Sequence, residues 1–290
     1  MKIVAVVITL FFLTLGDGQS SVSFLEPKCA ISNSNSASFI PNGQVANMLA
    51  NPWMVLIRHN SYCGGSLITN NFVLTAAHCR SNSPTVAFLG EFDTATLFDC
   101  SATGCKPSAY GVHVHAQISH PSYSSFGHQN DIALFRLARS VQYTDYVRPI
   151  CLLTNVDLLP QIRTFTATGW GKTAYSLESN KLLAATLMHV DRSFCSIYGS
   201  MDSSKICAKG FFSNTCYGDS GGPLMATVNI NGVNQVIQAG VTSYGHRECG
   251  QLSVFTNVAH HINWIAYVVQ QDIQRSTYNF YPNWYPYTYG

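Results

Sequence analysis

The chain has 290 residues, of which 47% are hydrophobic and 10% are charged, with a formal net charge of +2. Disordered chains combine low hydrophobicity with high net charge, so this composition excludes a largely disordered protein. Sixteen Lys and Arg against fourteen Asp and Glu leave no overall basic field for phosphate backbones, so we expect no nucleic-acid binding.

The N-terminal segment has the pattern of a secretion signal. Lys2 precedes an apolar run over residues 3–15, and the small residues Gly16 and Gly18 follow at a suitable cleavage point. A bilayer-spanning helix needs about 20 residues, so an uncleaved membrane anchor is the less favoured alternative. We expect residues 1–18 to be a signal peptide of a secreted protein with no membrane association.

Residues 19–39 differ from the rest of the chain in composition. They contain a polar Ser/Asn run over residues 32–36 and one cysteine, Cys29. Such a segment buries too little apolar surface to order itself, so we expect a flexible tether, and a plain linker is the simplest interpretation.

Short β-like runs separated by turn residues extend from Ile40 to about Tyr267. Their spacing is typical of an all-β barrel or sandwich. The clearest predicted strands are Trp53–Arg58, Phe72–Thr75, Thr85–Leu89, Ile132–Leu137, Thr164–Gly169, Gln235–Val241 and Ser253–Asn257.

Apolar residues near the end of the chain follow a helical period instead. Ile262, Ile265, Ala266 and Val269 fall at i, i+3, i+4 and i+7, which predicts a helix that packs on the barrel. Residues 271–290 are an aromatic-rich tail. This tail is either a poorly ordered end or an aromatic surface that docks a partner or the protein's own body.

Three short motifs carry the residues of a nucleophilic mechanism. They are centred on His78 (Thr-Ala-Ala-His-Cys), Asp131 (Asn-Asp-Ile-Ala-Leu) and Ser220 (Gly-Asp-Ser-Gly-Gly-Pro). A serine hydroxyl needs a base near neutral pH, and the base needs an acid that fixes its tautomer. These three are therefore candidate catalytic residues. The glycines beside the serine allow backbone N–H groups to converge on an oxyanion.

With these motifs the chain resembles the trypsin- and chymotrypsin-like serine proteases, from Ile40 to about Gln270. The resemblance implies an all-β fold of two packed six-stranded antiparallel barrels with a C-terminal helix, and a protease domain over residues 40–270. The stretch Asn51–Val55 and a small extra loop at Cys100 and Cys105 resemble those of insect clip-type proteases in particular, but residues 19–39 cannot hold a clip domain with its six cysteines. The alternative is an inactive homologue in which the triad residues remain only for packing.

The resemblance also implies roles for residues around the triad. Gly218 and Ser220 would supply the oxyanion N–H groups. Ser243 would support Asp131 and lie on the strand that pairs with the substrate backbone, where with Gly245 it lines the specificity pocket.

Substrate choice departs from the common patterns of that family. The pocket floor should be Asn214, where trypsin-like members carry Asp and chymotrypsin-like members carry Ser. Ser253 would replace a wall glycine and narrow the pocket. Because an amide has no charge to pair with a buried cation, we predict weak or absent preference for basic residues, with loose selection of medium polar or apolar side chains.

Activation departs from the family pattern as well. Relatives are cut after Lys or Arg, and the new amino terminus inserts beside the Asp that precedes the catalytic serine. Here Phe39 precedes Ile40, while Asp219 is in place to pair with the amino group of Ile40. We predict zymogen cleavage after Phe39 by a protease that prefers aromatic residues. A chain that is rarely activated is the alternative.

Ten cysteines in a chain with an export signal indicate a disulfide framework, and zinc ligation by them is disfavoured. The resemblance implies that cleavage would leave residues 19–39 tethered as a light chain. The implied pairs are Cys29–Cys151, Cys63–Cys79, Cys100–Cys105, Cys195–Cys207 and Cys216–Cys249.

Two other clusters have metal-ligating side chains. Three histidines lie close together, but no Cys or carboxylate completes a ligand set, so an ordinary exposed strand is favoured over a metal site. Three acids lie in a loop that binds calcium in some relatives, although calcium needs six or more oxygens. The clusters are His113, His115 and His120, and Glu91, Asp93 and Asp99.

Together these patterns predict a secreted serine endopeptidase made as a zymogen, with no cofactor and with no metal required. Its expected partners are protein or peptide substrates, an activating protease and serpin-type inhibitors. The competing hypothesis is a non-catalytic homologue that binds or regulates other members of a protease cascade.

Overall fold

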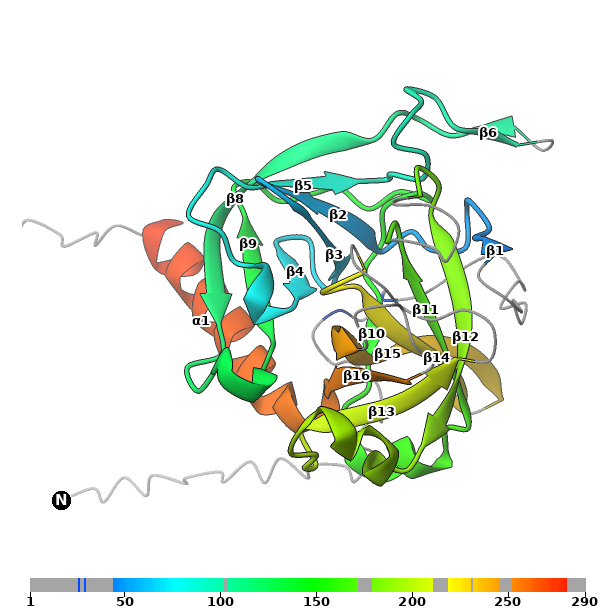
Figure 1. The fold of residues 1–290 in the computed structure, drawn as a ribbon. Helices are drawn as coiled ribbons and strands as arrows, with labels where there is room; N and C mark the ends of the chain where they lie inside the picture. Colours follow the sequence, from blue (N-terminus) through cyan, green and yellow to red (C-terminus); the bar gives the residue numbers. More distant parts are fainter. Residues whose placement is uncertain are drawn as a thin grey trace, which may run out of the picture.

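The computed structural model describes Glu26, Cys29 and residues 44–101, 104–171, 179–210, 219–230, 232–245 and 252–280, with residues 275–280 as backbone only. The first half of this chain forms a closed antiparallel barrel, drawn from blue to green in Figure 1. In order around the barrel, its strands are β2 (Met54–Arg58), β3 (Tyr62–Leu67), β4 (Phe72–Thr75), β9 (Ala133–Leu137), β8 (Tyr110–Ser119) and β5 (Val86–Leu89).

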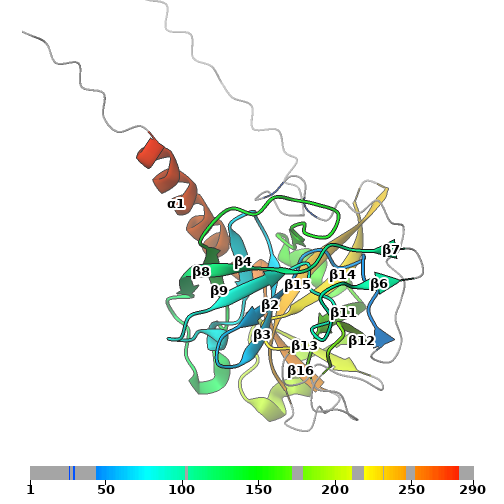
Figure 2. The same ribbon diagram turned by 90° about the horizontal axis from the view of Figure 1, so that it is seen from above.

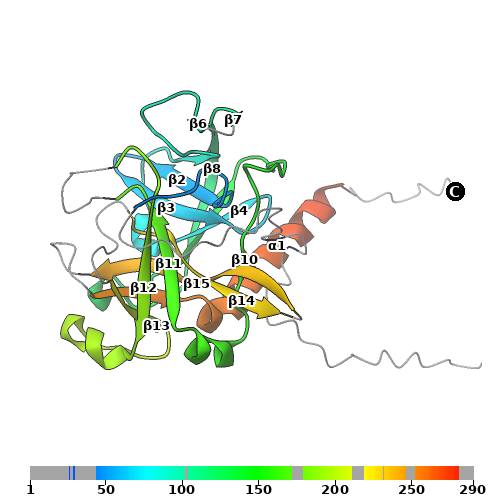
Figure 3. The same cartoon turned by 90° about the vertical axis from the view of Figure 1, so that its right-hand side faces the viewer.

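The second half forms another six-stranded antiparallel barrel, closed by the pairing of its first and last strands. Figure 3 shows it below the first barrel. Its strands are β12 (Leu183–Val190), β11 (Thr164–Gly169), β14 (Pro223–Ile230), β15 (Val233–Gly245), β16 (Leu252–Asn257) and β13 (Lys205–Gly210). Two short strands extend this sheet: β1 (Gln44–Val45) beside β12 and β10 (Cys151–Leu152) parallel to β15.

Each barrel has its own apolar core, and the two cores explain the continuous apolar runs of the sequence. Phe72 and Phe135 are buried in the first barrel, and Phe165 and Phe255 in the second. The first core continues into the second barrel through Met225, so apolar packing crosses the junction. Burying such side chains contributes about 1.5–3 kcal/mol each. The two barrels are therefore joined by shared apolar packing at their junction.

The C-terminal helix α1 (Ile262–Phe280) lies beside the first barrel (Figure 1). Ile265 and Val269 are buried, as the helical period predicts, and Arg136 of β9 contacts Asp272 with an Nε–Oδ1 distance of 2.8 Å. The helix continues beyond Gln270, the predicted end of the domain, and its later part extends away from the body in Figure 2. The first half of the predicted tail is thus helical, whereas residues 281–290 lie outside the described residues.

The predicted fold class is confirmed: two six-stranded antiparallel barrels and a C-terminal helix. Among the described residues, no helix has the length and apolar character needed to cross a bilayer. Short 3₁₀ turns connect several of the strands. They are η1 (Ala77–Cys79), η2 (Phe126–His128), η3 (Val156–Gln161), η4 (Arg192–Tyr198) and η5 (Ala259–His261).

Four disulfides staple the described chain. One attaches the segment before β1 to β10, and another joins β6 (Cys100–Ser101) to β7 (Gly104–Cys105) in a hairpin at the edge of the molecule (Figures 1 and 2). The fifth implied pair, Cys216 with Cys249, lies outside the described residues. The four disulfides are Cys29–Cys151, Cys63–Cys79, Cys100–Cys105 and Cys195–Cys207.

Candidate active site

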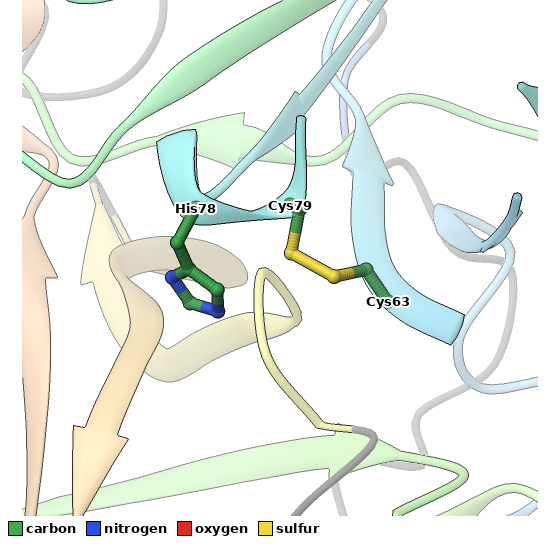
Figure 4. Close-up of side chains that lie close together, drawn as sticks. All are labelled: Cys63, His78 and Cys79. Carbon is green, nitrogen blue, oxygen red and sulfur yellow. A yellow bond between two sulfur atoms is a disulfide. The ribbon is translucent and has the colours of Figure 1, made fainter. Parts of the chain in front are cut away.

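His78 lies just after β4, in the turn η1. The hydroxyl of Thr75 donates to the carbonyl of Gly64 at 2.8 Å, and a disulfide joins Cys79 to Cys63 (Figure 4). These links fix both ends of the turn to β3. The His78 side chain is 24% exposed, so its imidazole is held by the barrel and still reaches solvent.

Asp131 lies two residues before β9 and has a fully buried side chain. Its Oδ1 accepts a hydrogen bond from the backbone N–H of His78 at 2.9 Å, and its Oδ2 lies 2.7 Å from His78 Nδ1. The hydroxyl of Ser243 donates to the same Oδ2 at 2.5 Å. Together these contacts align the imidazole, with the second nitrogen of its ring left for other partners.

The environment of Asp131 favours its ionised form. Burial by itself raises the pKa of a carboxyl group, but the contacts with His128, His78 and Ser243 act in the opposite direction and hold the pKa of Asp131 well below its usual range. The carboxylate therefore stays charged near neutral pH and stabilises a positive charge on His78.

Ser220 lies in the turn that leads to β14, and its carbonyl accepts a hydrogen bond from Gly64 N at 2.7 Å. The next residue, Gly221, has φ +80°, and a Cβ there would lie 2.1 Å from Thr75 Oγ1. Only glycine fits this turn. Ser220 and His78 line one cleft of about 700 Å³. The structure thus brings an imidazole, a buried carboxylate and a serine to the junction of the barrels.

This arrangement agrees with what comparison of the sequence reveals. A sequence model of the family described as Trypsin matches residues 40–265. The chain belongs to the trypsin family. The recognition made from the three motifs is therefore confirmed.

Individual members of the trypsin family show the same similarity. Serine protease grass of Drosophila melanogaster is 34% identical over 78% of this chain and 67% of its own length. CLIP domain-containing serine protease HP8 of Bombyx mori is 34% identical over 82% of this chain and 75% of its own. The crystal structure of the Drosophila Grass clip serine protease of the Toll pathway superposes with a TM-score of 0.74 and 31% identity, covering 83% of this chain and 75% of that one.

The residues predicted for activation lie partly in the described chain. Asp219 is 9% exposed, and its Oδ1 accepts a hydrogen bond from Gly171 N at 2.9 Å. A Cβ on Gly171 would lie 2.5 Å from the carboxyl carbon of Asp219, so the close approach requires glycine. Phe39 and Ile40 lie outside the described residues.

The predicted specificity pocket is described on one side. Ser243 and Gly245 lie on β15, and Ser253 faces Gly245 from the neighbouring position of β16. A Cβ at Gly245 would lie 3.1 Å from Ser253 Oγ, so the serine hydroxyl fills the space beside that glycine. Asn214 and Gly218, predicted for the pocket floor and the oxyanion hole, lie outside the described residues.

Lys106, the residue after β7, packs against the predicted calcium-binding cluster of acidic residues. The ammonium of Lys106 is buried, with its Nζ 3.1 Å from Asp99 Oδ2 and in contact with the carbonyl of Gly90. Burial raises the pKa of nearby Glu91. Asp93 lies 4.0 Å from Lys181 instead. A positive charge of the chain itself thus neutralises Asp99.

The other predicted metal candidates do not converge. His113 and His115 are exposed on β8, whereas His120 packs edge-on against the rings of His261 and Trp264. In the described part of the chain, no group of three metal-ligating side chains includes His113, His115 or His120.

Among the described residues, two clusters do gather three such side chains. One consists of His78 with Cys63 and Cys79, but Figure 4 shows that the two sulfurs are bonded to each other, so they offer no thiolate. The other consists of His78, His128 and Asp131. His128 belongs to the site and has no motif of its own that would have revealed it.

Tyr244 and Lys205 are further site residues that sequence reasoning missed. The ring of Tyr244 stacks on that of His128, with centroids 4.9 Å apart. Lys205 Nζ donates to the hydroxyl of Tyr244 at 3.2 Å and to the carbonyl of Gly127 at 3.0 Å. Tyr244 lies between Ser243 and Gly245 in the sequence, and this position is the one signal that could have identified it.

Proposed function

We propose that the protein is a secreted serine endopeptidase. The observation that carries this proposal is the buried contact of Asp131 Oδ2 with His78 Nδ1 at 2.7 Å, with Ser220 lining the same cleft as His78. Peptide hydrolysis by a serine nucleophile commonly uses this combination of nucleophile, base and orienting acid. Membership of the trypsin family supports the same activity.

In the proposed reaction, Ser220 Oγ attacks the carbonyl carbon of the scissile peptide bond while His78 accepts its proton. Asp131 holds the proton on the other ring nitrogen and stabilises the imidazolium. His78 then protonates the leaving amine, and a water molecule hydrolyses the acyl-enzyme by the same route. The N–H groups of Gly218 and Ser220 stabilise the oxyanion, an effect that is worth about 2.7–4 kcal/mol for one donor.

The zymogen part of the proposal concerns the amino terminus. Cleavage after Phe39 frees the amino group of Ile40, which inserts beside Asp219. The carboxylate of Asp219 is buried, so an amino group inserted beside it would form an ion pair that water screens little. The disulfide between Cys29 and Cys151 would keep the cleaved segment attached.

The specificity part of the proposal is that basic residues are not preferred at the cleaved bond. Asn214 at the pocket floor provides no negative charge, and Ser253 narrows the wall beside Gly245. Medium polar or apolar side chains fit such a pocket.

Because a relative of solved structure acts in the Toll pathway, we place this chain in an extracellular cascade with protein substrates, an activating protease and serpin-type inhibitors.

The test begins with the full secreted chain. Immobilised chymotrypsin should cut it so that sequencing starts at Ile40, and a Phe39→Arg variant cut by immobilised trypsin provides the same terminus independently. Both products should hydrolyse a peptide library, whereas Ser220→Ala cut in the same way should not. A correctly cut chain that hydrolyses nothing would instead make it a non-catalytic regulatory module. Exclusive cleavage after Arg or Lys would refute the proposed specificity.

A further inference from the structure

A second imidazole points at the carboxylate of the candidate triad. His128, the last residue of η2, places its Nδ1 3.6 Å from Asp131 Oδ2, which is too long for a hydrogen bond. That Nδ1 is buried and has no hydrogen-bond partner. The ring also meets the ring of His78 edge-on, with centroids 5.7 Å apart. Buried polar atoms usually have a hydrogen-bond partner, but His128 Nδ1 faces the Asp131 carboxylate without a hydrogen bond to it.

The position of His128 is imposed by its surroundings. Its φ of +48° lies in the left-handed region, which costs a non-glycine residue about 1 kcal/mol or more. Stacking on Tyr244 holds the ring from one side, and Lys205 Nζ binds both the Gly127 carbonyl and the Tyr244 hydroxyl. The imidazole is therefore preorganised, which reduces the entropy that a ligand would need to remove.

Two imidazoles and one carboxylate form a ligand set that suits zinc. One donor atom from each of His78, His128 and Asp131 lies within 4.8 Å of the others. Zinc accepts three such protein ligands and keeps a fourth position for water, whereas calcium and magnesium prefer oxygen ligands alone.

We propose that Zn²⁺ binds to His78 Nδ1, His128 Nδ1 and Asp131 Oδ2 and reversibly inhibits the enzyme. The inhibition rests on the proposed peptidase function, whereas the binding does not. Tetrahedral zinc with bonds of about 2.0–2.1 Å separates its donor atoms by about 3.3 Å. The His128–Asp131 separation of 3.6 Å is close to that value, and the His78–Asp131 separation of 2.7 Å needs to open by about 0.6 Å.

Inhibition follows from the tautomer of His78. In the free site, the proton of neutral His78 lies on Nδ1, facing Asp131, and Nε2 has the lone pair that accepts the proton of Ser220. Zinc takes the Nδ1 lone pair, so that proton moves to Nε2 and no proton is gained or lost. With a proton already on Nε2, His78 cannot act as the base. Removing the zinc reverses the change.

Binding is measured first, without reference to activity. Ser220→Ala in the full chain is titrated calorimetrically with zinc chloride alone, and we expect one site. Adding His128→Leu should weaken zinc binding by at least about 10- to 100-fold. Losing a residue that only hydrogen-bonds to a metal ligand already costs that much affinity, and His128 is proposed as a direct ligand. His113→Leu, which changes an exposed histidine of β8, is the matched control and should leave the affinity unchanged. Equal zinc affinity in all three proteins would overturn the proposal.

Inhibition is measured next with the activated Ser220 enzyme. Its rate should fall with added zinc and recover with EDTA, and the zinc concentration for half inhibition should rise at least tenfold in His128→Leu, each variant being compared with its own rate in EDTA. If His128→Leu does not fold, X-ray absorption spectroscopy at the zinc edge of the zinc-loaded, unsubstituted chain provides an independent test. Two imidazole ligands on the bound zinc would support the site, and fewer than two would refute it. An active enzyme that zinc does not inhibit overturns the proposed inhibition. Zinc binding without peptidase activity would refute the function and leave the site standing.

Discussion

Replacing Lys106 by Met tests whether the acidic loop depends on its internal cation. In the structure, Lys106 and Asp99 have side chains only 2% and 5% exposed, with Nζ 3.1 Å from Oδ2. Removing one partner of a buried pair leaves the other charge uncompensated, which costs about 3–5 kcal/mol. At about 2–4 °C per kcal/mol for a chain of this size, the melting temperature should fall by about 6–20 °C.

Urea unfolding of the variants in a Ser220→Ala background measures this cost without self-digestion. Lys106→Met/Asp99→Asn should recover at least half of the loss, because the buried charge is removed while Thr96 keeps an acceptor at 2.8 Å. Lys181→Met is the matched control. The Lys181 side chain is 54% exposed and its Nζ lies 4.0 Å from Asp93 Oδ2, so this substitution should cost less than about 1 kcal/mol. A loss below 1 kcal/mol for Lys106→Met would refute the buried pair.

Three further predictions concern the site and its supports. Asp131→Asn should fold normally and lower kcat by about 10⁴-fold, which is the loss that this change causes in the same triad arrangement. Steady-state kinetics of the activated protein measures it, and a loss below tenfold would contradict the prediction. Gly171→Ala places a Cβ 2.5 Å from the carboxyl carbon of Asp219 and should cost about 1–3 kcal/mol in urea unfolding, whereas an unchanged stability would show that Asp219 can move aside. Burial lowers the pKa of His261 to about 4 from 6.5. The neutral imidazole therefore contributes about 3 kcal/mol to the free energy of unfolding. This contribution is complete above pH 6.5 and is lost as the pH falls toward 4. His261→Leu should flatten the stability profile across that window, and an unchanged profile would exclude His261 as its source.

Apolar patterning predicted much of the fold because a barrel strand must bury a short continuous run. Phe72–Thr75 and Thr164–Gly169 match β4 and β11 at both ends, and the predicted Trp53–Arg58 differs from β2 by one residue. The mixed sequence of β8, which includes His113 and His115, gives no such run.

The extent of the C-terminal helix was harder to predict. The apolar period stops at Val269, and the following residues are mostly polar. The helix continues nonetheless through Asp272, which contacts Arg136 of β9. A tertiary contact of this kind has no local signature, so the sequence boundary at Gln270 does not correspond to a structural one.

The site shows the same division between local and long-range information. His78, Asp131 and Ser220 lie in motifs that a nucleophilic mechanism explains, and the structure brings His78 and Asp131 into contact. His128 comes near them because two non-glycine residues, His128 and Asn130, adopt positive φ of 48° and 50°. Asn and His adopt positive φ more often than most residues, but the sequence does not show where they do so, because surrounding contacts impose this conformation.

The most direct test of the central claim is to map a covalent adduct on the activated protein. A fluorophosphonate reagent reacts with a serine only when a base activates it and an oxyanion hole receives the phosphonyl oxygen. After cleavage before Ile40, mass spectrometry of peptide fragments should find one adduct, on Ser220, formed much more slowly in Asp131→Asn. An adduct on another serine, or none on a correctly cleaved chain, would contradict the assignment of this protein as a serine endopeptidase.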